Sequence, residues 1–308
     1  MFQFRKSLYL AIAVLAIFPQ TALLARQPAT DSGQGKIAFQ SRRDGHFQIY
    51  LMNADGSDVK NVSNDAYDDE DPAWSPDCKQ IAFSTYRGTP ERSHIYVTNT
   101  DGSDQHVITS GDTVDFEPTW SPDGKYITSY DGVQAVIRVV SIATGEQFTL
   151  PSATGGDMPT WSPDSKSILF TDEATSPDGS SSWSVIKMAS VSTGDISIWI
   201  GKSDTQDYQY GDLAWAPNPD EIIIGLRLPP NFTARGLLLV HPSDPGGPVV
   251  ANDPQFVYQT PKWDLWGKEV LLQEEMITGQ HTTNIAVWET GLSQPRVVVQ
   301  GTWPHWLP

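Results

Sequence analysis

The chain has 308 residues, of which 19% are charged and 39% hydrophobic, and it contains 24 glycines and 23 prolines. This composition is typical of many short strands joined by turns rather than of a helical bundle or a disordered chain. A net charge of −17, from 37 acidic and 20 basic residues, disfavours nucleic acid and anionic lipid as partners. The single cysteine, Cys78, excludes an internal disulfide and a cysteine-based zinc cluster.

Residues 1–25 have the pattern of a secretory signal peptide. Two cations precede an apolar run from Leu8 to Phe18, and small residues follow up to Ala25. The run is short for a bilayer span, although the poor cleavage sequence leaves an uncleaved membrane anchor as the alternative. We therefore expect a periplasmic or extracellular protein without membrane insertion after cleavage, with a linker over residues 26–35 and one folded domain over residues 36–308.

A short motif centred on tryptophan recurs along the chain. The letters PAWSPDCK begin at Pro72, PTWSPDGK at Pro118 and PTWSPDSK at Pro159, and three weaker copies follow. The aligned tryptophans, separated by 46, 41, 54, 48 and 43 residues, are Trp74, Trp120, Trp161, Trp215, Trp263 and Trp306. Such a spacing fits a four-stranded propeller blade.

Each unit has the same order of strand and turn signals. Ser-Pro-Asp-Gly after the tryptophan predicts a tight hairpin, because proline presets φ and glycine accepts a positive φ. Cys78 and Ser165 replace this glycine in two copies, so a strained or altered turn is expected there. An apolar strand such as residues 80–84 follows, then a third strand, an Asp-Gly or Thr-Gly turn and a more polar outer strand. Residues 172–183 and 228–235 are expected to form long loops.

The two ends of the chain supply complementary parts of one blade. The first unit begins at Lys36 without a tryptophan strand, whereas the last unit stops at its tryptophan strand, on Trp306. Pairing of this last strand with residues 37–41 would complete a sixth blade and protect both sheet edges. The sequence thus predicts an all-β fold, a closed six-bladed β-propeller of four-stranded antiparallel blades, with five blades and a loose tail as the alternative.

Acidic residues gather just before the tryptophan motifs. Because the innermost strand of a blade begins at the rim of the axial channel, we expect these acids around one channel mouth, in a ring left incomplete at Tyr258 and Gly301. The ring would bind a cation or dock a basic protein segment, or would be a solvated rim that keeps the protein soluble. The candidate partner-binding residues are Asp68, Asp69, Asp71, Asp115, Glu117, Asp157, Asp207 and Asp212.

Catalytic chemistry finds little support in the sequence. The tryptophans are interpreted as packing between blades rather than as a sugar-stacking surface. No Gly-x-Ser-x-Gly hydrolase motif is present, and the six histidines are dispersed without short metal-ligand spacing. We therefore predict no catalytic residue and no cofactor, with a divalent cation such as calcium in the axial channel as the alternative. A metal-dependent lyase or lactonase acting on carbohydrate or lactone, with histidines converging on the axis, stays open as the alternative.

The PxWSPDGK motif, followed by an apolar strand and an Asn-x-Asp-Gly turn, resembles the TolB-like propeller repeat family, most closely at residues 49–57. The resemblance covers residues 36–308. It implies a non-catalytic binding scaffold in the cell envelope that engages a protein or peptide partner through the channel mouth or blade loops, and we expect a monomer. The α/β domain that precedes the propeller in TolB proteins has no counterpart in this sequence, so coupling through that domain is not expected.

Overall fold

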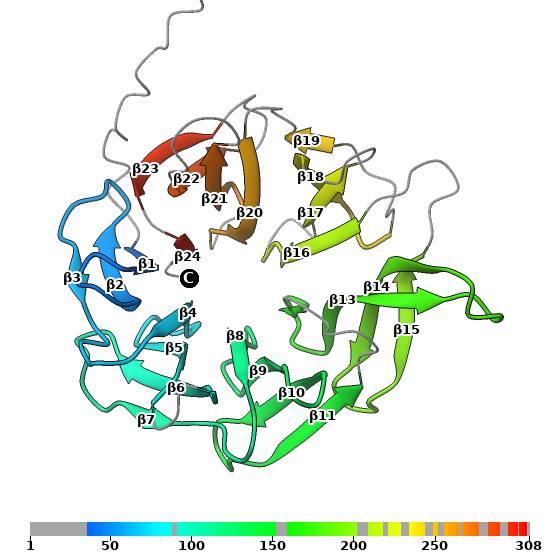
Figure 1. Cartoon of the computed structure of the whole chain (residues 1–308), viewed down its shortest axis with the longest axis horizontal. Coiled ribbons are helices and arrows are strands. Elements are labelled where there is room, and N and C mark those ends of the chain that lie inside the picture. The colour runs from blue at the N-terminus through cyan, green and yellow to red at the C-terminus, as the bar shows by residue number, and fades with distance from the viewer. Residues whose placement is uncertain are drawn as a thin grey trace, which may run out of the picture.

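The computed structural model describes residues 36–87, 91–151, 159–201, 209–217, 221–228, 234–243, 249–251, 256–264, 267–276, 283–289, 295–300 and 302–306. Within these ranges the chain forms 24 strands and no helix. The strands make six four-stranded antiparallel sheets, arranged around a common axis as the blades of a propeller (Figure 1). None of the described ranges contains a helix that could span a membrane.

The strands of blades 1 to 3 are given from the channel outward. Blade 1 contains β24 (Thr302–Trp306), β1 (Lys36–Ser41), β2 (Gln48–Asn53) and β3 (Lys60–Asn61). Blade 2 contains β4 (Asp69–Trp74), β5 (Gln80–Thr85), β6 (His94–Asn99) and β7 (His106–Val107). Blade 3 contains β8 (Asp115–Trp120), β9 (Tyr126–Asp131), β10 (Val136–Ser141) and β11 (Gln147–Pro151).

Blades 4 to 6 follow the same order. Blade 4 contains β12 (Thr160–Trp161), β13 (Ser167–Thr175), β14 (Ser182–Ser190) and β15 (Ile196–Ile200). Blade 5 contains β16 (Gln209–Trp215), β17 (Ile222–Leu228), β18 (Ala234–Val240) and β19 (Val249–Ala251). Blade 6 contains β20 (Phe256–Trp263), β21 (Glu269–Met276), β22 (Thr283–Glu289) and β23 (Arg296–Gln300).

The last strand of the chain completes the first blade. β24 pairs antiparallel with β1, with Ile37 opposite Trp306 and Gln40 opposite Thr302. The sheet order β24-β1-β2-β3 gives blade 1 its fourth strand from the C-terminal end. The predicted closed ring of six blades is therefore confirmed, and the five-bladed alternative is wrong.

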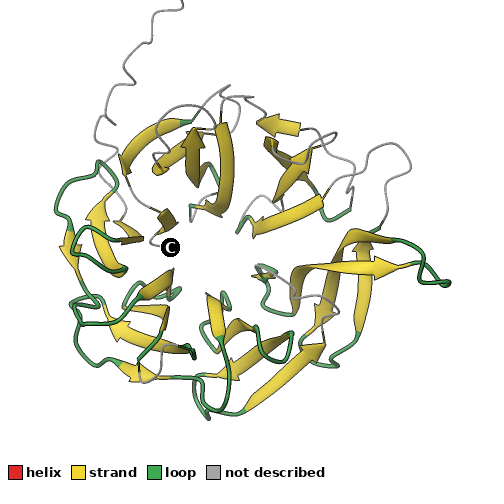
Figure 2. Ribbon diagram, in the orientation of Figure 1, coloured by secondary structure: helices red, strands yellow, loops and turns green. Residues whose placement is uncertain are grey.

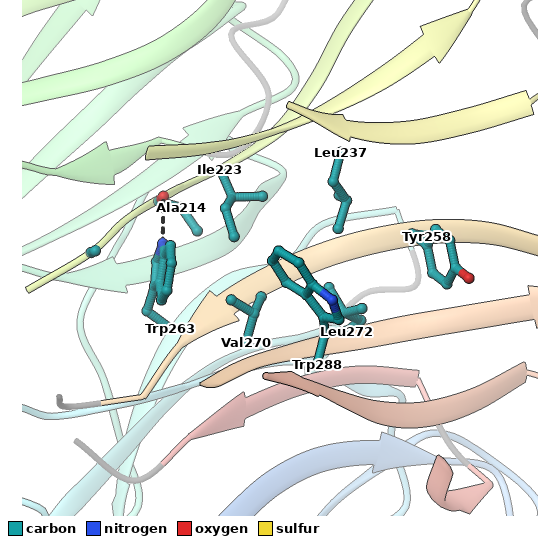
Figure 3. Packing of buried hydrophobic residues seen from close by; sticks show 9 residues of the cluster. Ala214, Ile223, Leu237, Tyr258, Trp263, Val270, Leu272 and Trp288 are labelled. Carbon is teal, nitrogen blue, oxygen red and sulfur yellow. Dashed lines mark hydrogen bonds between the residues drawn. The ribbon is translucent and has the colours of Figure 1, made fainter. Parts of the chain in front are cut away.

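The core lies between neighbouring blades. One cluster joins Ile49 of blade 1 to Trp74 and Phe83 of blade 2. Another joins Ile223 of blade 5 to Trp263 of blade 6, and Figure 3 shows their side chains between the two sheets. Because apolar area removed from water is the main favourable term in folding, these layers hold the blades together.

The five motif tryptophans of blades 2 to 6 pack at these junctions, as predicted, and the side chain of the sixth, Trp306, lies outside the described residues. Trp74, Trp161 and Trp263 are buried. The Trp263 indole Nε1 donates a hydrogen bond of 3.1 Å to the carbonyl oxygen of Ala214 in blade 5 (Figure 3). The Trp120 indole makes the equivalent bond of 3.2 Å to the carbonyl oxygen of Ala73 in blade 2. Both bonds fix one blade against the preceding one, because a buried indole N–H favours such an acceptor.

The turn after the tryptophan keeps one geometry whether or not glycine is present. The amide of Cys78 donates to the carbonyl of Ser75, and the Ser75 hydroxyl donates to Asp77. The φ angles of Cys78 and Ser165 are +64° and +59°, in the left-handed region that favours glycine. The expected strain at these two positions is confirmed. The turn has the same hydrogen bond there as at Gly124, so its type does not change.

The loop expected at residues 172–183 was largely wrong. Residues up to Thr175 extend β13, and Ser182 and Trp183 belong to β14, so the two strands pair along nine residues each. Only residues 176–181 form a turn, in which the Ser176 hydroxyl donates to Asp178. A second Ser-Pro-Asp-Gly sequence thus closes a long hairpin. In the other expected loop, residues 229–233 lie outside the described residues.

Candidate functional site

The two faces of the ring are built differently. Antiparallel pairing places the turns at residues 75–80, 121–126 and 162–167 on the same face as the turns between the third and fourth strands, which we call the turn face. The innermost strands β4, β8, β16 and β20 begin on the opposite face, which we call the mouth face. These strands surround the axis of the ring (Figure 2).

Each of these innermost strands is interrupted shortly before its tryptophan. The pairing register shifts between Glu70 and Ala73, Phe116 and Thr119, Tyr210 and Leu213, and Gln259 and Lys262. At the shifts, Asp71, Glu117 and Thr260 have φ angles of +55°, +55° and +49°. Such bulges bend a strand and re-aim its side chains, so they determine where the acids of the mouth stand.

Two predicted acids link neighbouring blades through these bulges. The Asp71 carboxylate accepts hydrogen bonds from the backbone N–H of Glu117 at 3.2 Å and from the Ser84 hydroxyl at 3.0 Å. The Asp212 carboxylate accepts one from the backbone N–H of Thr260 in blade 6. Both carboxylates therefore have a structural role, which sequence reasoning missed because it depends on contacts between blades.

A lysine shares the channel with these acids. Lys262 on β20 is partly exposed, and its charge interacts with Asp71, Glu117 and Asp212 from three other blades. Burial lowers the pKa of Lys262 below its ordinary value, while the three carboxylates act in the opposite direction. Burial raises the pKa of Asp71, against its hydrogen bonds and the lysine charge. The group brought together is thus of mixed charge rather than purely acidic.

Sequence reasoning overlooked Lys262, although a signal was available. The weaker copy of the motif in blade 6 reads PKWD, with lysine where the other four complete copies, in blades 2 to 5, have alanine or threonine. A charged residue at a position where the related repeats have a small residue departs from the repeat pattern, and such departures often mark a residue with a specific function.

Two other predicted acids are fully buried within their own blades. Asp69 lies 3.7 Å from the guanidinium of Arg87, which also pairs with Asp65. Asp115 accepts a hydrogen bond of 3.1 Å from Nε of Arg138. Burial raises the pKa of Asp69 to about 7, because loss of solvation outweighs the attraction of Arg87. Neither carboxylate is on the surface for a partner to touch.

The other predicted acids fall at different places. Asp68 is partly exposed and accepts a hydrogen bond of 2.7 Å from the backbone N–H of Phe47, at the junction of blades 1 and 2. Next to it on β4, burial and the neighbouring carboxylates raise the pKa of Glu70 to about 7. Asp157 and Asp207 lie outside the described residues. Asp71, Glu117 and Asp212 therefore share an electrostatic interaction with Lys262, whereas Asp68 contacts blade 1.

The histidines whose side chains are described do not meet. His46 contacts the carbonyl of Asp65 in the connection between blades 1 and 2, His94 and His106 belong to blade 2, and His241 directly follows β18 within blade 5. Among the described residues, no group of three or more histidines, cysteines or acids could hold a metal ion.

Comparisons with known proteins agree with the fold. TolB from Acinetobacter baumannii superimposes with a TM-score of 0.69 at 19% identity, covering 89% of this chain and 67% of that one. A chain of the nidogen/laminin complex gives 0.63 at 13% identity, covering 89% and 98%. Oligogalacturonate lyase from Vibrio parahaemolyticus gives 0.59 at 12% identity, covering 86% and 74%. These likenesses establish the architecture.

The sequence itself identifies the family. No curated protein matches the chain significantly. The sequence model described as the TolB beta propeller domain matches residues 20–217, more than half of the chain. The chain belongs to the TolB β-propeller domain family.

Proposed function

We propose that the protein is a non-catalytic binding scaffold outside the cytoplasm that holds a protein or peptide partner at its mouth face. The observation that carries the proposal is that Asp71, Glu117 and Asp212, from three blades, interact electrostatically with Lys262 of blade 6 on innermost strands, where the repeat diverges. Charged groups gathered on a rigid scaffold, at a place where the repeat does not demand them, favour recognition over packing.

Charge supports the choice of partner. The net charge of −17 attracts a basic protein or peptide at long range, and Asp68, Glu70 and Glu117 on two adjacent blades are partly exposed near the mouth. A propeller of the same fold occurs in the nidogen/laminin complex, which is one case of this architecture in a protein assembly. The same distribution of charge gives no support to nucleic acid as a partner.

Capture of partners from an envelope extract tests the proposal. Purified residues 26–308 serve as bait, together with a mouth variant, Asp68→Asn/Glu70→Gln/Glu117→Gln. The control on the turn face, Asp58→Asn/Asp104→Asn/Glu146→Gln, replaces three acids at exposed positions. We expect the wild type and the control to capture the same proteins and the mouth variant to lose them. Identical capture by all three would contradict the acidic-mouth proposal.

A metal-dependent lyase is the second candidate, and the fold shared with oligogalacturonate lyase favours it. Incubation with oligogalacturonate and manganese, followed by absorbance of the unsaturated product, tests it. Product formation that is lost on chelation would replace the scaffold proposal.

A further inference from the structure

Three arginines cover aromatic rings at the mouth-face end of blades 1 and 2. Their guanidinium carbons lie between 4.0 and 5.6 Å from the ring centroids, within the range of a cation–π contact. Each arginine comes from the segment between the second and third strands of its blade, counted from the channel. The chain itself therefore supplies the cation for these rings. The stacked groups are Arg42 with Phe47, Arg43 with Phe39 and Tyr50, and Arg87 with Phe83 and Tyr96.

Tyr67 is an aromatic residue at the same end whose ring has no such cation. It stands two residues before β4 begins and is 46% exposed. Over the described part of the chain, no arginine or lysine stacks on its ring. Because the face of an aromatic ring attracts a cation, this ring is open to one from another molecule.

Tyr67 also differs from the residue at the same position of the next repeat. Thr113, like Tyr67, stands seven residues before the motif tryptophan. Thr113 is buried, and its hydroxyl donates a hydrogen bond of 2.7 Å to the buried carboxylate of Asp115. In blade 2 the corresponding carboxylate, Asp69, instead accepts a hydrogen bond of 3.5 Å from the buried amide of Gln48. The side chain of Tyr67 therefore does not serve the buried acid of its blade.

The backbone of Tyr67 is fixed on both sides of the residue. Its N–H donates a hydrogen bond of 2.7 Å to the carboxylate of Asp65, and its carbonyl oxygen accepts one of 2.7 Å from the amide of Gln48. Asp65 is itself held, because its N–H donates to the Gln48 side chain at 2.9 Å and its carboxylate pairs with Arg87. A side chain on a fixed backbone has less freedom to lose when a partner binds.

A carboxylate stands next to this ring. Asp68 is partly exposed and is oriented by a hydrogen bond of 2.7 Å from the backbone N–H of Phe47. The guanidinium of Arg42 lies 4.0 Å from Asp68 and 4.0 Å from the centroid of the Phe47 ring. An arginine that stacks on an aromatic ring beside Asp68 thus already occurs within the chain. A planar guanidinium group suits such a place, since it stacks through its face and donates hydrogen bonds from its edge.

We propose that Tyr67 anchors the partner at the mouth face, by receiving the guanidinium group of a partner arginine on its ring while Asp68 pairs with the same group. This inference rests on the proposed function and names the side chain that a basic partner presents to blades 1 and 2. The net charge of −17 attracts a segment that carries such an arginine.

Calorimetric titration of the purified protein with a synthetic peptide of three Gly-Ser-Arg repeats, at about 20 mM salt, tests the proposal. We expect Tyr67→Leu, which keeps an apolar side chain but loses the ring, to weaken binding about two- to fivefold. Tyr67→Phe keeps the ring and should bind as the wild type does. Phe148→Ala removes an exposed ring from the outer strand β11 and should leave the affinity unchanged. The same peptide with citrulline in place of arginine should not bind.

Three results would overturn the proposal. They are wild-type affinity in Tyr67→Leu, equal loss in Tyr67→Phe and Tyr67→Leu, and equal binding of the citrulline peptide. The mouth variant Asp68→Asn/Glu70→Gln/Glu117→Gln, titrated with the same arginine peptide, separates this inference from the proposed function. Weaker binding by the mouth variant together with wild-type affinity in Tyr67→Leu would leave the acidic mouth in place and remove Tyr67 as its anchor. Wild-type affinity in both would contradict both proposals.

Discussion

The innermost strands of the blades have similar residues at the end that lies on the turn face and different residues at the end that lies on the mouth face. At the turn face, the hydroxyl of a serine donates to an aspartate two residues on in blades 2, 3 and 4, at 2.8, 2.8 and 2.7 Å. In blades 2, 3, 5 and 6 the residue three before the tryptophan is Asp71, Glu117, Asp212 and Thr260, and in blades 1 and 4 the sequence has Trp303 and Met158 there. The repeated serine–aspartate pair closes the turns of blades 2 to 4, whereas the residues before the tryptophan differ from blade to blade and include charges that the fold of a single blade does not require.

The separation is not complete, because two acids of the mouth also join blades. Asp71 and Asp212 accept backbone hydrogen bonds from the next blade while they face Lys262. These two acids therefore also stabilise the fold, and substitutions can measure how much unfolding free energy they contribute.

The largest effect is expected at a turn-face glycine. Gly102 has φ +89°, and a Cβ placed there would lie 2.8 Å from the backbone oxygen of Val62 in the preceding blade. Gly102→Ala should therefore lower the free energy of unfolding by about 3 kcal/mol, through backbone strain and a clash with backbone that cannot rotate away. Gly145→Ala is the control, with φ +70° and open space, and should cost about 1 kcal/mol. If urea unfolding gives the same loss of unfolding free energy for both variants, the contact between Gly102 and Val62 does not restrict the side chain at position 102.

The next largest effect tests the structural share of the mouth. Asp212→Ala removes the acceptor of the Thr260 amide and should cost about 2 kcal/mol in urea unfolding. Asp212→Asn keeps an acceptor oxygen and should cost clearly less. If both variants are as stable as the wild type, the hydrogen bond between Asp212 and Thr260 does not stabilise the fold.

A smaller effect is expected from pH. Burial raises the folded-state pKa of Asp69 to about 7, above its unfolded value near 4, so the folded protein holds a proton that the unfolded chain has released. Stability from this proton is lost as the pH rises through 7, and should fall by roughly 1 kcal/mol between pH 6 and pH 8. Asp69→Asn should flatten this part of the profile measured by chemical denaturation. The prediction is wrong if the stability of the wild type rises between pH 6 and pH 8 and if Asp69→Asn has the same dependence of stability on pH.

The smallest effect is a gain. Cys78→Gly relieves a positive φ and should raise the Tm, with a gain of about 1 kcal/mol. Ser165→Gly relieves the same strain but also removes the acceptor of the Asp123 N–H, so it should gain less. Gly124→Ser, the reverse change in blade 3 at φ +71°, should lose a similar amount. Equal Tm values for all three variants would mean that the turn carries no strain.

The repeated parts of the molecule could be predicted from the sequence, since the motif spacing counts the blades and the missing strand before Lys36 matches the extra strand at Trp306. The arrangement of residues at the mouth face could not be predicted in this way. The bulge at Thr260 and the hydrogen bond from Thr260 to Asp212 depend on contacts between blades, which no local sequence pattern encodes. The hairpin around Ser176 was missed because its turn residues also suit a polar loop.

The measurement that separates the two faces most directly is the affinity of the captured partner for the mouth variant and for the turn-face variant, at low and at moderate salt. We expect the mouth variant Asp68→Asn/Glu70→Gln/Glu117→Gln to bind at least tenfold more weakly than the wild type at low salt, as expected for about 1.4 kcal/mol or more of lost interaction, and we expect this difference in affinity to be smaller at moderate salt. The turn-face variant should bind as the wild type does. Equal affinities for the two variants, at equal stability, would contradict it.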